Sequence, residues 1–317
     1  MKRLSHQRLV GAAVIGLVLG GLGLQNLLAR QGYEMALAAG LLCPSVAALV
    51  TAGELGRRAL GGLAMLRRAL ETGVALALVA YGVAFSHGLF AGFCDLRAGT
   101  VLFVLGPGVG TVLGSVWGTV AAELPPQLGM QRSRKRSAVS VLVAVGGPLG
   151  SILVNLALIY GSPVIFAYDP FAGYFSGALY DTVLTTEGMW SYRAASAATL
   201  LSCWVAAWHL ERNGEGRLRF VSRRRPGVLA CGALAAAASI GTVALGDRLG
   251  HWQTASSIAA ELGGETIVGS CQVRHDRRIP QEDVRRFAAD CAAHVATIRQ
   301  WLGRGSDEPV MVYLFHN

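Results

Sequence analysis

The stretch that decides the fold of this chain is "LGPGVGTVLGSVWG", residues 105–118. It is apolar, and its glycines recur every four residues, at Gly106, Gly110, Gly114 and Gly118. Glycines at this spacing line one helical face and let a second helix approach closely, as helices do in membranes. We therefore expect these four residues to form a helix-packing face.

Proline interrupts this stretch at Pro107, and "GGPLG" at 146–150 repeats the pattern in the next apolar segment. Both sites are expected to kink or break their helices. One interpretation is a discontinuous helix pair around a substrate site, as in transporters. The other is close packing with a tolerated kink, which we favour because Gly and Pro are common in membrane helices.

The composition places the rest of the chain in the same class. Of 317 residues, 53% are hydrophobic and 15% are charged, whereas ordinary soluble domains are about 25% charged. The net charge of +9 is divided among short blocks between apolar stretches, so no nucleic-acid partner is expected. The sequence predicts an α-helical polytopic membrane protein whose main partner is the lipid bilayer.

A bilayer core needs about 20 mainly apolar residues per helix. Seven stretches satisfy this and together define a transmembrane domain over residues 1–246. The predicted spans are 9–28, 34–53, 73–93, 100–121, 138–160, 192–210 and 227–246.

The distribution of Lys and Arg predicts the orientation of these spans. The N-terminus and the loops after spans two, four and six hold 17 of the 28, while the alternate loops hold three and the remaining eight follow span seven. Lys and Arg concentrate on the cytoplasmic side of a membrane. The prediction is a bacterial inner-membrane protein with a cytoplasmic N-terminus and a periplasmic or extracellular C-terminus.

Ionisable residues within the predicted spans are few. His87 is the deepest, and Asn155 is a polar residue of span five. A lone membrane histidine is expected to bond a neighbouring helix rather than to relay protons. No chain of carboxylates follows any span, which counts against an ion-coupled pump.

The long loop predicted at 161–191 is rich in aromatic residues. Eight of the 24 aromatics of the chain fall between residues 166 and 192. This indicates either a segment in the lipid headgroup layer or a platform for the C-terminal region. Asp169 and Asp181 are expected to cap or to initiate turns.

From residue 247 to residue 317 the chain becomes charged and regular, and we expect an extracytoplasmic α/β domain. The predicted elements are a helix at 254–264, a strand at 265–276, a helix at 279–303 and a final apolar strand at 310–315 buried on both faces. Cys271 on the strand and Cys291 on the buried stripe of the long helix are candidates for a disulfide, with two buried thiols as the alternative.

The segments "QVRHD", "EDVRRFAADCAAHVATIRQWLG" and "EPVMVYLFHN" resemble the opening of a peptidase-MA-like, gluzincin-type domain. Some bacterial members of that group carry such a domain after several membrane spans, and a later H-E-x-x-H helix binds their zinc. This chain contains no H-E-x-x-H, so the resemblance transfers no catalytic or metal-binding residue. We expect no cofactor and no peptidase activity, and we expect the segment to be the first part of a longer domain or a degenerate copy.

Three functions remain open on the sequence. The first is a membrane protein with an inactive, peptidase-like outer portion. The second is a transporter or channel subunit, and the third is a sensor or assembly factor that binds a protein partner through its outer domain or final strand. No catalytic motif decides among them.

Overall fold

The computed structural model describes residues 5–93, 95–130, 134–164, 166–176, 187–213, 217–221, 225–303 and 308–316. The chain divides into two compact units. The helical unit comprises Met1–Leu158 and Phe166–Trp252, and the α/β unit comprises Ile159–Ile165 and Gln253–Asn317. The division falls near the boundary expected at residue 247.

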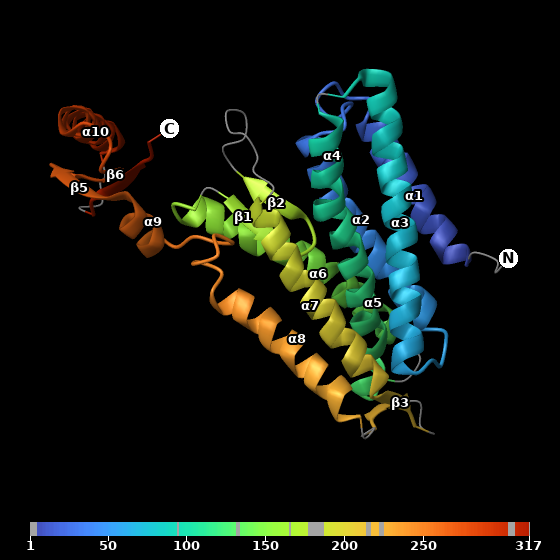
Figure 1. The fold of residues 1–317 in the computed structure, drawn as a ribbon. Helices are drawn as coiled ribbons and strands as arrows, with labels where there is room; N and C mark the ends of the chain where they lie inside the picture. The colour runs from blue at the N-terminus through green and yellow to red at the C-terminus, as the bar shows by residue number, and fades with distance from the viewer. Residues whose placement is uncertain are drawn as a thin grey trace. The chain divides into compact units, whose positions relative to one another are not determined.

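The helical unit contains helices in the region of each predicted span (Figure 1). They are α1 (His6–Leu22), α2 (Tyr33–Leu55), α3 (Gly62–Ala91), α4 (Leu96–Phe103), the π-helical turn η1 (Val104–Gly108), α5 (Val109–Gln127), α6 (Arg134–Gly161), α7 (Glu187–Trp208) and α8 (Pro226–Ala244). Two short antiparallel hairpins flank α7, namely β1 (Phe166–Asp169) with β2 (Gly173–Ser176), and β3 (Leu210–Arg212) with β4 (Leu218–Phe220).

Among the described residues, five helical segments are long and apolar enough to cross a membrane. They are α2, α3, the combined α4–η1–α5, α6 and α8. Helix α1 is apolar but has only 17 residues, and α7 has 22 residues but is not among the five. The structure therefore supports a helical membrane protein with several spans.

Helix α2 lies at the centre of the helical unit and packs on α1, α3 and α5. Many of its buried side chains are small, and Ala47 and Ala48 are completely covered. A Cβ added at Gly114 would collide with the backbone of Pro44, and one at Gly118 would collide with the carbonyl oxygen of Ala48. The α2–α5 seam is therefore a backbone-to-backbone contact that side chains larger than hydrogen would open.

The proline stretches behave differently from one another. Gly106 has non-helical dihedrals (φ −80°, ψ −105°), so the passage from α4 to α5 is interrupted as expected. Of the kink or break expected at 146–150, the break is absent, because α6 continues through Pro148 without a gap. Helix α3 also begins at Gly62, well before the predicted start of span three at residue 73.

The α/β unit contains α9 (Ala255–Leu262), β5 (Gly263–Val268), β6 (Cys271–Asp276), α10 (Gln281–Leu302) and β7 (Val310–Leu314). The strand order is β5-β6-β7, with β5 antiparallel and β7 parallel to β6. The core joins Val273 of β6 to Val284 and Ala288 of α10. Strand β6, helix α10 and strand β7 thus form a parallel crossover unit.

Two predictions for this unit are wrong. The single strand expected at 265–276 is part of the β5–β6 hairpin, which turns at Gly269 with a φ of +54° that favours glycine. The final strand is not buried on both faces. It pairs only with β6 in the described part of the sheet, and Val310 is 40% exposed.

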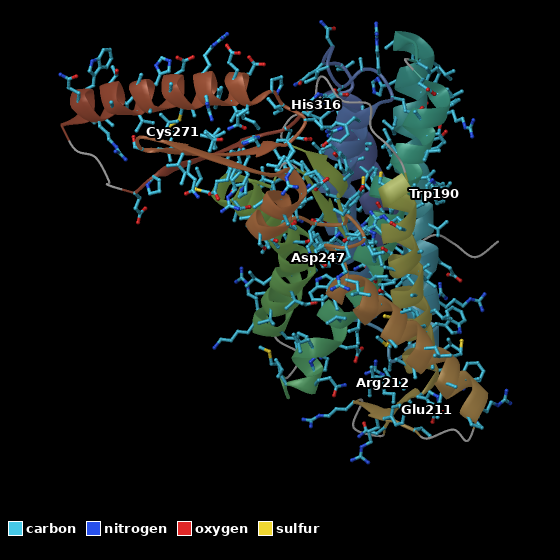
Figure 2. The ribbon with its side chains drawn as sticks, turned by 60° about the vertical axis from the view of Figure 1, so that its left-hand side comes forward. Trp190, Glu211, Arg212, Asp247, Cys271 and His316 are labelled. Atoms are coloured by element: carbon cyan, nitrogen blue, oxygen red, sulfur yellow. A yellow bond between two sulfur atoms is a disulfide. The ribbon has the colours of Figure 1, made fainter. Side chains whose placement is uncertain are left out.

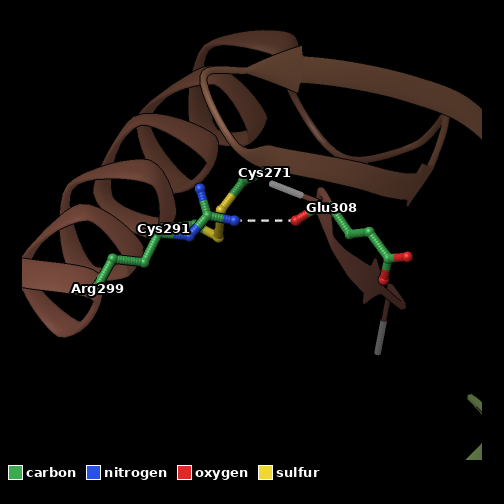
Figure 3. The surroundings of a disulfide bond; sticks show 4 residues. All are labelled: Cys271, Cys291, Arg299 and Glu308. Atoms are coloured by element: carbon green, nitrogen blue, oxygen red, sulfur yellow. Dashed lines mark hydrogen bonds between the residues drawn. A yellow bond between two sulfur atoms is a disulfide. The ribbon is translucent and has the colours of Figure 1, made fainter. Parts of the chain in front are cut away.

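A disulfide joins Cys271 of β6 to Cys291 of α10, with the two Cα atoms 6.2 Å apart (Figure 3). Near the same bond, the Arg299 Nη2 donates to the carbonyl oxygen of Glu308 at 2.9 Å. These two links hold α10 to strand β6 and to the segment that enters β7.

Candidate functional site

One side chain donates hydrogen bonds to two backbone carbonyls at the interruption between α4 and α5. The Arg193 guanidinium, from α7, donates through Nε to the Leu105 carbonyl and through Nη2 to the Gly106 carbonyl, the latter at 3.2 Å. Its Nη1 donates to the Pro170 carbonyl at 2.8 Å. A planar guanidinium suits this arrangement because its N–H groups diverge in a fixed fork.

Asp169 supplies the opposite charge in the same region. Its carboxylate accepts hydrogen bonds from the Ser151 hydroxyl and, at 2.7 Å, from the Asn155 amide, both on α6. It also accepts from the backbone N–H groups of Phe171 and Ala172 at 2.7 Å. The turn role expected for Asp169 is confirmed, and its bonds to α6 are an addition that the sequence did not reveal. Asp181 lies outside the described residues.

The tip of the β1–β2 hairpin fills the space beside the interruption. A Cβ at Gly110 would collide with the Phe171 carbonyl oxygen, and one at Gly40 would collide with Ala172. Gly173, at φ +97°, brings its own Cα region against Gly106. The two cavities that border this tip each hold about 10 Å³, roughly the volume of one water molecule.

These contacts define the hairpin lock: Asp169 to Gly173 of the hairpin, Arg193 of α7, and Leu105 and Gly106 of the interrupted helix. Asp169 and Arg193 are 1% and 5% exposed, and each attracts the other electrostatically. A buried charge is tolerated when hydrogen bonds replace its lost hydration. Arg193 donates to three backbone carbonyls, and Asp169 accepts four hydrogen bonds. The lock is therefore a hydrogen-bonded polar cluster within an apolar helical unit.

Aromatic rings surround one side of the lock. Tyr168 stacks on Tyr192, with ring centroids 5.3 Å apart, and also contacts Tyr174. The expected aromatic cluster of this region is therefore packed ring against ring. Tyr180, which belongs to the same run of aromatics, lies outside the described residues.

His251 joins this aromatic group and forms a pair with a hydroxyl. Its Nε2 lies 2.8 Å from the Ser191 Oγ, which also donates to the Gly188 carbonyl at 3.0 Å. Burial lowers the pKa of the His251 imidazole. The contact ties Ser191 of α7 to the residue that follows α8 and its turn.

The remaining residues singled out in the sequence do not gather around this site. His87 packs against Gly23, and the His209 Nδ1–H donates to the Val221 carbonyl oxygen, 3.1 Å away. Among the described residues, no three His, Cys, Asp or Glu side chains lie together as metal ligands would. His275, His294 and His316 belong to the α/β unit and are not brought into such a group.

Sequence reasoning missed the role of Arg193, which counted only as one of three loop charges on the outer side. A signal was available, because the predicted span at 192–210 includes this arginine near its start. The bond to residues nearly 90 positions away carries no local signature. No protein-family model, curated protein or solved structure matches the chain.

Proposed function

We propose that this chain is a multi-pass protein of a bacterial inner membrane whose seven helical passes hold the α/β unit outside the cytoplasm. Helices α1 and α7 complete the seven, and the Lys and Arg distribution sets the N-terminus in the cytoplasm. In this proposal the helical unit anchors the protein in the membrane, and the α/β unit is exposed outside the cytoplasm.

The disulfide is the observation that carries this proposal. Cys271 and Cys291 are bonded, whereas Cys43, Cys203 and Cys231 of the helical unit are free thiols. Disulfides persist in oxidising compartments such as the periplasm and are rare in the cytosol. A bonded pair in the α/β unit agrees with the side that the charge distribution assigns to it.

Reporter fusions test this topology. Fusions at Arg134 should report the cytoplasm, and fusions at Gly173 and Arg285 should report the periplasm or exterior. A cytoplasmic signal at Arg285 would contradict the proposal even if the protein is found in the membrane, because seven passes require the two termini to lie on opposite sides.

We further propose that the α/β unit is a peptidase-MA-like portion without catalytic activity. The parallel unit of β6, α10 and β7 has the strand–helix–strand order that the resemblance implies. His294, the histidine four residues after Asp290 on α10, is exposed. A catalytic zinc needs about three protein ligands in fixed geometry, so this pair alone supports no chemistry.

The role of sensor or assembly factor is the second candidate, and one surface favours it. The α10 side chains Trp301 and Leu302 are 85% and 70% exposed, and β7 has one unpaired edge among the described residues. Strand addition at an open edge is a common way to bind an extended partner. Photo-crosslinking from position 311 in cells should yield one discrete adduct if this function holds, and only diffuse products if it does not.

A transporter or channel subunit has weaker support. The interrupted helix invited that interpretation, but the hairpin lock occupies the interruption and the cavities at its border hold about 10 Å³ each. A substrate site in a broken helix presents free backbone groups to the substrate. Here Arg193 already bonds the two freed carbonyls.

A further inference from the structure

A cavity of about 240 Å³ lies between α2, α5 and α6, where α2 ends and α6 begins. We call it the α2–α6 cavity. Its polar lining consists of Arg57, Arg136, Ser137 and Ser140, and no carboxylate lines it. The volume suits a small head group rather than a drug-sized ligand, since pockets for the latter hold about 300–1,000 Å³.

Arg57 is not among the arginines that pair with carboxylates at this end of the helical unit. Among the described residues, the nearby carboxylates of Glu54, Glu71 and Glu123 are each paired with arginines other than Arg57. The pairs are Arg8–Glu54, Arg58–Glu54, Arg67–Glu71 and Arg212–Glu123. Arg57 forms no ion pair or hydrogen bond in the described part of the chain. An unpaired guanidinium at a cavity wall favours an anionic ligand.

The neutral groups of the cavity also fit an anion. The Ser137 hydroxyl makes no hydrogen bond within the described residues. The Ser140 hydroxyl donates its hydrogen to the Ala121 carbonyl at 2.8 Å, so this hydrogen is not free to bond a ligand in the cavity. Arg136 adds a second positive charge to the same lining.

The apolar part of the wall indicates which anion fits. Leu49 and Val141 line the cavity beside the arginines, and Val141 is 50% exposed on α6, a helix apolar enough to cross the membrane. A ligand there meets cations at one end and apolar, lipid-facing surface at the other. Arginine matches phosphate geometry bidentately.

We propose that the α2–α6 cavity binds the phosphate group of an anionic phospholipid, with Arg57 as the principal donor and Arg136 and Ser137 beside it. The glycerol and the start of an acyl chain lie against Leu49 and Val141. The inference rests on the proposed membrane topology only in that α2 and α6 cross the bilayer, which places the cavity at the cytoplasmic leaflet.

Native mass spectrometry of the full chain in detergent tests the site, with phosphatidylglycerol and phosphatidylcholine as probes. The protein should bind phosphatidylglycerol about tenfold more tightly, and Arg57→Gln should remove about that factor, as expected for a charge-assisted hydrogen bond. Ser137→Trp, which fills the cavity without changing its charge, should cause a similar loss. Arg219→Gln is the matched control, because it removes one exposed charge from β4 and should leave the affinity within about twofold.

Two outcomes would overturn the proposal. An equal loss in Arg57→Gln and Arg219→Gln would show general attraction to a positive surface. Displacement by inorganic phosphate, with no preference between the two lipids, would assign the cavity to free phosphate. Failure of the topology is seen separately, because reporter fusions respond to membrane orientation and not to lipid affinity.

Discussion

At the residue scale, Arg193 and Asp169 do most to shape this molecule. Each is buried, and each bonds backbone that an interruption or a tight turn leaves open. The turn at Asp169 followed from its place before Pro170, because aspartate bonds the backbone N–H groups that follow it. The position of Arg193 did not follow, because its acceptors belong to another helix and the sequence carries no local trace of that pairing.

Replacing Arg193 by Met should destabilise the protein markedly. The change leaves the Leu105, Gly106 and Pro170 carbonyls without their donor. A buried acceptor left without a hydrogen bond costs about 1–3 kcal/mol. The midpoint of thermal unfolding in detergent should therefore fall, by several degrees.

Arg219→Met is the control, because Arg219 is exposed and surface substitutions change stability by about 0.5 kcal/mol or less. Equal midpoints for the two variants would show that the hairpin lock does not hold the interrupted helix.

At the element scale, a helix lies in the region of each predicted span, and five helical segments of the described residues are long and apolar enough to cross a membrane. The ends of the helices differ from the predicted ones. Helix α3 starts at Gly62 and so continues beyond the apolar stretch, through Arg67 and Glu71, which pair across one turn at 3.1 Å. Helix α6 tolerates Pro148, whose lost hydrogen bond does not end a long membrane helix. The β5–β6 hairpin was missed although Gly269 and Ser270 form its two-residue turn.

Removing the disulfide should loosen the α/β unit selectively. The bond closes a loop of 20 residues, for which chain entropy predicts a contribution of about 3 kcal/mol. A unit this small has little core to compensate. Cys271→Ser with Cys291→Ser should therefore raise the rate of proteolysis between residues 253 and 303 in the full-length protein. Cys231→Ser, at an exposed free thiol, should leave the rate unchanged, and equal rates in all three proteins would contradict the assignment.

At the scale of the whole molecule, composition and charge blocks indicated a membrane protein, and the helical unit agrees with it at the level of several apolar helices. The C-terminal α/β class was also visible, because α10 has a clear apolar period and ends at Gly303, in the left-handed region at φ +59°. The burial of the final strand was harder to predict, since an unbroken apolar run looks the same in a central strand and in an edge strand such as β7. No sequence pattern could supply the neighbour that β7 lacks.

The purified chain should carry no stoichiometric zinc by elemental analysis. Its outer histidines lie on different elements: His275 on β6 hydrogen-bonds Thr266 at 3.3 Å, and His294 lies on α10. A zinc site needs convergent ligands. One zinc per chain that is lost on changing His294→Ala would restore an enzymatic assignment.

The hairpin lock also sets an order of events during synthesis. Arg193 is made 88 residues after Leu105, and a ribosome adds about 5–20 residues per second. For roughly 4–18 seconds, the Leu105 and Gly106 carbonyls of the growing chain exist without the arginine that bonds them in the finished structure. A chain stalled between residues 110 and 190 lacks that donor altogether, so its interrupted helix cannot be closed from within the chain.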